Sequence, residues 1–335
     1  MKKTFFKKVK WILTLGVVTA FSSSYALTQE EIQKGLKESY NSFKKLNTGK
    51  NASYIPDLAK VNPALFGIVI MTIDGKMYHI GDADAPFSIQ SISKPLVYGL
   101  ALKDNGRSVN LKLGLNATGQ KFNSIHAIET TPSHVQNPMV NAGAIQATSF
   151  IKGKTSAEKW DRVLGFVRDL SDGKPYFGEA VYRSETSTNK RNQAISGLLN
   201  SYGMMASDPN DALERYTKAC SIMINTKQLA LIGATLANKG VNPITKKSIL
   251  PAEYVNDVIA EMAVNGLYET SGEWWVNVGV PSKSGVGGGI LAVIPNKFAI
   301  AVFSPPLDDA GNSVRAQKVI EYLSKAWKLH FLELK

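Results

Sequence analysis

Ser91 and Lys94 lie three positions apart in the segment Phe87–Pro95. On a helix this spacing places the hydroxyl and the amine on one face, and a serine beside an amine base is a recognised type of activated nucleophile. The spacing alone is weak evidence, because Ser-x-x-Lys also occurs at Ser42/Lys45, Ser149/Lys152, Ser156/Lys159, Ser171/Lys174 and Ser187/Lys190. The surroundings of Ser91 must therefore distinguish it from the other five serines.

Pro95 indicates that Ser91 opens a helix. Proline costs least within or just after the first turn, where its missing N–H has no intrahelical partner to lose. The helix is expected to end near Asn105–Gly106. A β-hairpin is predicted just before it, because two apolar runs flank the turn Asp74–Gly75. Ser91 is thus expected where a sheet meets a helix.

A second motif lies near the other end of the chain. Lys-[Ser/Thr]-Gly occurs once, at Lys283–Gly285, and opens a glycine-rich strand whose backbone could approach a ligand closely. Ser-x-x-Lys on a helix followed by Lys-[Ser/Thr]-Gly on a strand is the signature of the serine β-lactamases and penicillin-binding proteins. The pair is more specific than either half and favours acyl transfer through a serine.

Strand patterns occur towards both ends of the chain, and helical patterns lie between them. Residues 65–81 and 282–303 are rich in β-branched and apolar residues, whereas apolar residues at helical spacing dominate from about 107 to 265. Helices are also predicted from Thr28 to about Leu46 and from Asn312 to Leu334. The predicted fold class is α+β: an antiparallel sheet from both chain ends, flanked by helices, with an all-helical subdomain inserted at roughly 107–265.

Residues 1–26 read as a cleaved secretory signal, so that residues 27–335 would form a single catalytic domain. Met1–Lys10 carries five lysines and no acidic residue, an apolar stretch of about eleven residues follows, and Ser24-Tyr25-Ala26 has small residues at the cleavage positions. The apolar stretch is too short for a membrane span, which needs roughly 20 residues. We therefore expect export to the periplasm or medium, with no membrane insertion after cleavage.

Composition argues against several other classes of protein. Loss of the five lysines lowers the formal net charge from +12 to about +7, and the remaining cations are scattered rather than gathered into a nucleic-acid surface. The lone Cys220 excludes an intrachain disulfide. The four histidines are widely separated and show no metal-ligand spacing. No cofactor, metal or nucleic-acid partner is expected.

Five segments of the chain resemble the bacterial glutaminase family in order and spacing. They are FSIQSISK at 87–94, NPMVNAGAI at 137–145, ETSTNKRN at 185–192, GATLANKGV at 233–241 and KSGVGGG at 283–289. The resemblance spans roughly residues 54–331. It implies a β-lactamase/transpeptidase-like fold, hydrolysis of L-glutamine to L-glutamate and ammonia through a glutamyl ester, and assembly as a homodimer or homotetramer.

The resemblance also implies roles for individual residues. Ser91 matches the nucleophile and Lys94 the adjacent base, while Tyr54 and Tyr268 match active-site tyrosines. Lys283 completes the catalytic set as a candidate cation that could lower the pKa of Lys94. The substrate-binding positions are Ser91, Asn141, Glu185, Asn192, Tyr216, Tyr268 and Val286, the last through its backbone.

Structural roles and other functions remain open from the residues alone. Asn141 could be only a helix cap, and Glu185 only a solvated charge at a helix end. A β-lactamase or D,D-peptidase would need a further Ser-x-Asn or Tyr-x-Asn element, which Ser187–Asn189 and Tyr254–Asn256 match by letter. A non-catalytic amino-acid sensor on the same fold is the other alternative.

Overall fold

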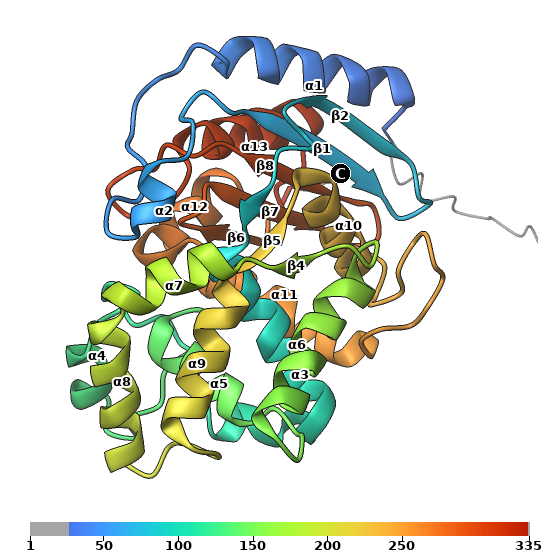
Figure 1. The fold of residues 1–335 in the computed structure, drawn as a ribbon. Coiled ribbons are helices and arrows are strands. Elements are labelled where there is room, and N and C mark those ends of the chain that lie inside the picture. Colours follow the sequence, from blue (N-terminus) through green and yellow to red (C-terminus); the bar gives the residue numbers. More distant parts are fainter. Residues whose placement is uncertain (1–26, 334–335) are drawn as a thin grey trace, which may run out of the picture.

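A computed structural model describes residues 27–333; the predicted signal segment lies outside them. Its centre is an antiparallel five-stranded sheet in the order β2-β1-β8-β7-β6 (Figure 1). The strands are β1 (Gly67–Thr72), β2 (Met77–Gly81), β6 (Ser282–Gly285), β7 (Gly289–Ile294) and β8 (Phe298–Phe303). β1 pairs with β8, so the sheet joins the two ends of the chain. The predicted hairpin and the predicted α+β class are both confirmed.

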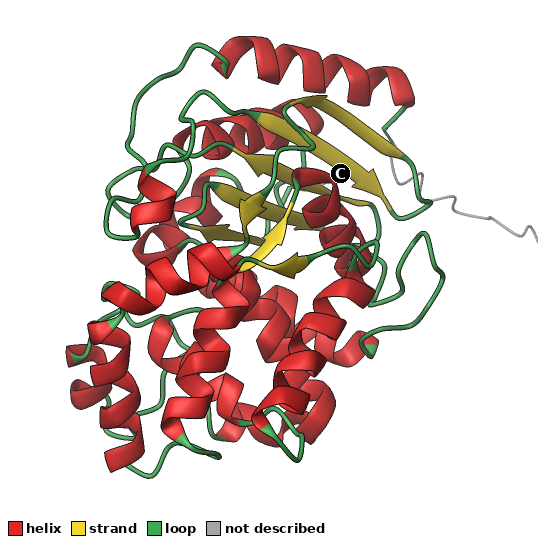
Figure 2. Ribbon diagram, viewed as in Figure 1, coloured by secondary structure: helices red, strands yellow, loops and turns green. Residues whose placement is uncertain are grey.

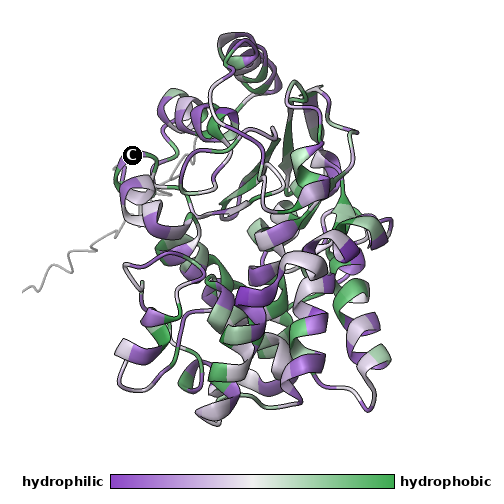
Figure 3. Ribbon diagram, turned by 60° about the vertical axis from the view of Figure 1, so that its left-hand side comes forward, coloured by the Kyte–Doolittle hydropathy of each residue, from purple (hydrophilic) through white to green (hydrophobic). Residues whose placement is uncertain are grey.

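Helices cover both faces of this sheet because its residues alternate between two cores. Ile68 and Ile70 face α1 (Gln29–Phe43) and α13 (Val314–Trp327), whereas Val69 and Met71 belong to the larger core that includes α10 (Thr226–Ala237). Helix α1 begins with the predicted capping box, in which Thr28 and Glu31 each bond the other's backbone N–H. Figure 3 shows the strands coloured as hydrophobic beneath more mixed outer helices.

Helices fill the other half of the molecule (Figure 2). They are α3 (Ser93–Asn105), α4 (His126–Thr130), α5 (Asn141–Ser149), α6 (Ser156–Leu170), α7 (Glu179–Thr188), α8 (Lys190–Ser201), α9 (Pro209–Cys220) and α11 (Ala252–Asn265). Helices α2 (Pro56–Ala59) and α12 (Ser271–Asn277) lie at the level of the sheet instead, and Trp274 of α12 shares a core with α1 and α13 (Figure 1). Short 3₁₀ turns lie at η1 (Gln90–Ile92), η2 (Gly106–Leu111) and η3 (Tyr268–Thr270). In residues 27–333 we find no helix with the length and apolar character that a bilayer span requires.

The structure differs from the sequence prediction at several boundaries. The C-terminal helix ends at Trp327 rather than Leu334, because Lys328 adopts a left-handed conformation. A small second sheet, in the order β3-β5-β4, was not predicted. Its strands β3 (Phe87–Ser88), β4 (Tyr176–Phe177) and β5 (Ile222–Ile224) are too short to show a period of two.

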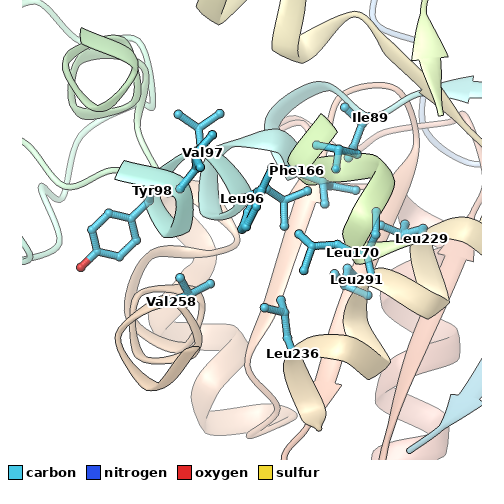
Figure 4. Close-up of a cluster of buried hydrophobic side chains, with 14 of the residues drawn as sticks. Ile89, Leu96, Val97, Tyr98, Phe166, Leu170, Leu229, Leu236, Val258 and Leu291 are labelled. Carbon is cyan, nitrogen blue, oxygen red and sulfur yellow. The ribbon is translucent and has the colours of Figure 1, made fainter. Parts of the chain in front are cut away.

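Helix α3 is the element that fixes the position of the Ser-x-x-Lys motif. All its residues from Ser93 to Leu102 are buried, so it is a core helix rather than an amphipathic surface helix. Leu96 packs in one cluster with Phe166 of α6 and Leu291 of β7 (Figure 4). Because α3 packs against α6 of the helical half and against β7 of the central sheet, the Ser-x-x-Lys motif is held between the two.

Candidate active site

Ser91 lies in the 3₁₀ turn η1, immediately before helix α3. The expectation that Ser91 itself opens the α-helix is therefore wrong, because the α-helix begins two residues later, at Ser93. Lys94 still follows Ser91 by three residues, in the first turn of α3. The serine is only 6% exposed. The backbone of Gln90 just before it adopts φ +49°, a left-handed conformation that a non-glycine residue rarely holds.

The glycine-rich segment packs directly against this serine turn. It is not one continuous strand as predicted, because β6 ends at Gly285, residues 286–288 form a turn, and β7 begins at Gly289. A Cβ on Gly285 would lie 2.7 Å from the carbonyl oxygen of Ile89, and one on Gly287 would lie 2.3 Å from that of Ser88. Any larger residue would push the strand away from the serine. The two motifs that the sequence analysis singled out therefore meet in space, backbone against backbone.

Lys94 is a fully buried lysine. Its Nζ donates to the Asn141 Oδ1 at 2.7 Å and to the Met139 carbonyl at 3.3 Å, and lies 5.7 Å from the centre of the Phe122 ring. Burial lowers the pKa of Lys94 to about 8, since a charged amine is poorly solvated there. The side chain can therefore be neutral near physiological pH, as a general base requires.

Lys283 and Tyr268 lie against each other on the strand side of the site. The Lys283 Nζ donates to the Gly266 and Ser284 carbonyls, each at 2.8 Å, and lies 4.3 Å from the centre of the Tyr268 ring. Burial, and then the charge of Lys94, hold the pKa of Lys283 well below its usual range. Burial rather than a cationic Lys283 is thus the cause of the low pKa of Lys94.

The Tyr268 hydroxyl connects this side to the serine. It is in side-chain hydrogen-bond contact with Ser91, and it also donates to the Ser284 carbonyl at 3.4 Å. Burial raises the pKa of Tyr268, so the phenol keeps its proton. A neutral hydroxyl beside Ser91 can both accept and donate a proton during a reaction.

Asn141, Tyr216 and Asn192 form a hydrogen-bonded network around Lys94. The Asn141 Oδ1 accepts from the Tyr216 hydroxyl at 3.1 Å as well as from Lys94, and its Nδ2 donates to the Asn192 Oδ1 at 2.9 Å. Asn141 is the first residue of α5, and its side chain makes no capping bond. The simple helix-cap interpretation of Asn141 is therefore wrong.

Glu185 is a buried carboxylate on α7. It is 7% exposed, and its Oε2 accepts from the Gln90 Nε2 at 3.4 Å. Burial raises the pKa of Glu185 to about 7, although Gln90 and Lys94 oppose the shift. No cation forms an ion pair with it within residues 27–333. The alternative of a solvated helix-end charge is wrong, and the carboxylate is placed to receive a cationic ligand.

Tyr54 and Val286 line the mouth of the site. They border a cleft of about 610 Å³ together with Phe122 and Gly311. Tyr54 is 53% exposed and lies at the rim, but burial of its hydroxyl, and then the nearby Tyr268 and Glu185, raise its pKa, so the hydroxyl end of the side chain faces the buried network. The sequence analysis missed Phe122, whose ring centre lies 4.8 Å from that of Tyr268 with the two planes tilted by 40°. In the sequence, Phe122 is a single aromatic residue in an otherwise polar loop, which gave little indication that it belongs to the site.

The elements required by the β-lactamase alternative do not join the network. Ser187 is exposed and donates to the Ser184 carbonyl within α7. Tyr254 packs against the large core from α11. Neither therefore supplies the third element that a β-lactamase requires beside the serine and the lysine.

The two shifted pKa values predict how turnover depends on pH. A neutral Lys94 accumulates above about pH 8 and an ionised Glu185 above about pH 7. Both reactive forms increase as the pH rises, so we expect kcat/KM for an amide substrate to climb between about pH 6 and 9 in two coupled steps. Initial rates at low substrate concentration measure this profile.

Glu185→Gln provides the matched test of that assignment. The Glu185 charge raises the pKa of Lys94, so its removal should shift the remaining step below pH 8 and leave a single step. A variant profile that kept both steps, or moved the upper one to higher pH, would contradict the assignment.

Comparison with known proteins gives one consistent match. A family model described as Glutaminase matches residues 49–332. A glutaminase of Colwellia psychrerythraea is 47% identical over 303 residues, covering 90% of this chain and 97% of the relative. Glutaminase 1 of Escherichia coli K12 is 45% identical over 300 residues, covering 89% and 97%.

Solved structures agree with this match. The probable glutaminase ybaS superimposes with a TM-score of 0.90 at 43% identity, covering 92% of this chain and all of that one. A probable glutaminase of Bacillus subtilis, solved with 6-diazo-5-oxo-L-norleucine, gives a TM-score of 0.83 at 30% identity, covering 91% and 99%.

Proposed function

Because the chain belongs to the glutaminase family and is thus an amidohydrolase acting on glutamine, we propose that its reaction passes through a glutamyl ester on Ser91. The observation that carries this proposal is the position of Ser91. Its hydroxyl contacts a neutral phenol, Tyr268, while a lysine with a pKa of about 8 follows one turn later. A primary amide is a poor electrophile, so the serine needs such an activating base.

In the first half of the reaction, neutral Lys94 takes the proton of Ser91 as Oγ attacks the amide carbon. The N–H groups of Ser91 and Val286 stabilise the oxyanion, a contribution of about 10²–10³ in rate per donor. Collapse breaks the C–N bond, and Tyr268 protonates the departing nitrogen, which leaves as ammonia. Lys94 then returns its proton through Tyr268.

In the second half, water attacks the ester carbon and the same groups act in reverse. The water proton passes to the base, the C–Oγ bond breaks, and Ser91 recovers its proton as glutamate is released. The close packing of the turn between β6 and β7 against the segment that carries Ser91 supports this role for Val286, since it brings the backbone of the turn beside the serine.

The other end of glutamine carries an ammonium and a carboxylate. Glu185 is assigned to the ammonium because it is a buried carboxylate without an ion-pair partner in the described part of the chain. Asn192 and Tyr216 are assigned to the carboxylate. Both already bond Asn141, which in turn bonds Lys94, so substrate recognition and the base share one network.

Substitution Glu185→Gln is expected to lower kcat/KM for glutamine by about 10²–10³, because the substrate ammonium would be buried without a counter-charge. The matched probe is glutaramic acid, which has the same amide and carboxylate but no ammonium. Wild type should discriminate strongly between the two amides and the variant only weakly. Unchanged discrimination would remove Glu185 from ammonium recognition.

Ammonia release from glutamine, measured beside nitrocefin hydrolysis, tests the substrate class directly. We expect turnover of glutamine and none of nitrocefin. Nitrocefin hydrolysis at a comparable rate would instead support the β-lactamase alternative.

We also infer an exported homodimer or homotetramer. The basic, then apolar, start of residues 1–26 supports export. Mass spectrometry of the N-terminus from the periplasmic fraction would test cleavage after Ala26, and sedimentation of the purified protein would test assembly. A cytoplasmic, uncleaved chain or a monomer would contradict these two inferences respectively.

A further inference from the structure

A second cleft adjoins the mouth of the active site and has cationic residues in its lining. It has a volume of about 740 Å³ and lies between the end of α1, helix α2 and the start of α13. The loop from α1 to α2 forms one of its walls and runs down one side of the molecule (Figure 1). Five of its lining residues are cationic and none is acidic: Lys44, Lys45, Lys50, Lys60 and Arg315. We call this feature the basic cleft.

The charges of the basic cleft are not balanced by ion pairs. The ion pairs found in residues 27–333 involve other side chains. Lys44 donates only to the Asn41 Oδ1 at 2.8 Å. Burial lowers the pKa of Arg315, and Tyr40 and Asp82 oppose the shift; Asp82 does not line the cleft, and its Oδ2 accepts from the Phe66 N–H at 2.9 Å. The cleft therefore presents a net positive field to whatever enters it.

Arg315 is the buried floor of this cleft. It is only 4% exposed, and its guanidinium lies 5.2 Å from the centre of the Phe66 ring. Its terminal nitrogens donate to the carbonyls of Pro63 and Ala64, whereas its Nε has no acceptor. Nearby, the buried Asn51 Oδ1 has no donor. An arginine buried without an ion-pair partner costs free energy that an anion would offset.

We propose that the basic cleft binds a small molecule carrying two or more phosphate or carboxylate groups. Arg315 is the anchor, since a planar guanidinium matches the paired oxygens of either group. The lysines at the rim are exposed, and their flexible side chains can place positive charge against anions of different shape. None of the residues assigned above to catalysis or substrate binding lines the basic cleft, whereas Tyr54 and Val286 line the neighbouring cleft, so the ligand is not the glutamine of the proposed reaction.

The basic cleft shares a wall with the active-site cleft. Gly49, Lys50, Asn51 and Ser53 line both, and the same segment continues to Tyr54 at the active-site rim. The Lys50 N–H and carbonyl pair with Leu307, which holds the middle of this wall in place. An anion bound to Lys50 would therefore contact the segment that carries Tyr54.

Isothermal titration of the purified protein with inorganic pyrophosphate and, separately, with citrate tests the proposal at constant ionic strength. The variant is Lys45→Glu/Lys60→Glu, and Lys34→Glu/Lys190→Glu is a control with the same change in charge on exposed positions outside the cleft. We expect saturable binding of at least one of the two anions to the wild type. Its Kd should rise about tenfold or more in Lys45→Glu/Lys60→Glu and less than about twofold in the control. The tighter of the two anions identifies phosphate or carboxylate as the preferred group.

Hydrogen exchange provides a second readout that does not depend on turnover. Binding should slow exchange in residues 47–54 in the wild type and in Ser91→Ala alike. Absence of saturable binding, or equal weakening in both charge variants, would overturn the proposal. A change of assembly state in the first variant without loss of anion affinity would also overturn it, because the cleft would then be a protein interface.

Discussion

Replacement of Ser91 by alanine is expected to lower the kcat for glutamine by about 10⁴-fold or more, because removal of a nucleophile eliminates the covalent route and leaves only binding and oxyanion stabilisation. The side chain is small and lies beside the cleft, so the fold should tolerate the loss. Ammonia release under saturating glutamine measures the effect. Wild type should also yield γ-glutamyl hydroxamate when hydroxylamine competes with water for the ester, and the variant should not.

Ser93→Ala is the matched control for this experiment. Ser93 is two residues away and is also buried, but its Oγ faces the Cys220 sulfur at 3.9 Å. We expect its kcat to stay within about threefold of wild type, as is usual for one weak contact. If Ser91→Ala retained a tenth of wild-type turnover, or still formed hydroxamate, the glutamyl ester would have to form elsewhere.

Replacement of Lys94 by methionine should lower kcat by about 10²–10⁴, the usual contribution of a general base. Methionine has a similar length and suits a buried position, so packing is largely kept. Added methylamine should restore part of the rate, and the restored rate should increase with the concentration of the neutral amine. Ammonia cannot be the readout in the presence of an amine, so glutamate formation should be measured.

Lys103→Met is the control, since Lys103 lies on the same helix and its amine bonds only the Ile249 carbonyl, at 2.8 Å. It should show neither the loss nor the rescue. A Lys94→Met enzyme that kept the rise in kcat/KM near pH 8 would show that another group titrates there. Lys283 would then be the first candidate, because it is the other buried amine of the site.

Local sequence signals predicted the elements that carry the motifs. The capping box at Thr28, the hairpin turn at Asp74–Gly75 and the proline after Lys94 each act within a few residues. The resemblance to a family supplied the positions that local signals could not, including Asn141 and Glu185. Their assigned roles are still to be tested by the substitutions above.

The electrostatic character of the site could not be predicted from the sequence. The pKa of Lys94 depends on burial by α5 and by the loop that carries Phe122, and that of Glu185 on burial beside Gln90. These contacts join residues far apart in the chain, and they exist only after folding. The left-handed backbone of Gln90 likewise lies against Gly285 and Gly287, a contact between segments almost 200 positions apart in the sequence.

The pairing of β1 with β8 has a consequence for biosynthesis. Gly67 can pair early with Gly81 in the hairpin, but its second partner is Phe303, so the central sheet cannot close on a nascent chain. Ser91 and Lys283 likewise come together only after most of the polypeptide has left the ribosome. Closing so long a loop is entropically costly, which predicts slow, largely post-translational folding and a late onset of activity. A chain truncated before β8 should therefore lack turnover while keeping the whole Ser-x-x-Lys motif.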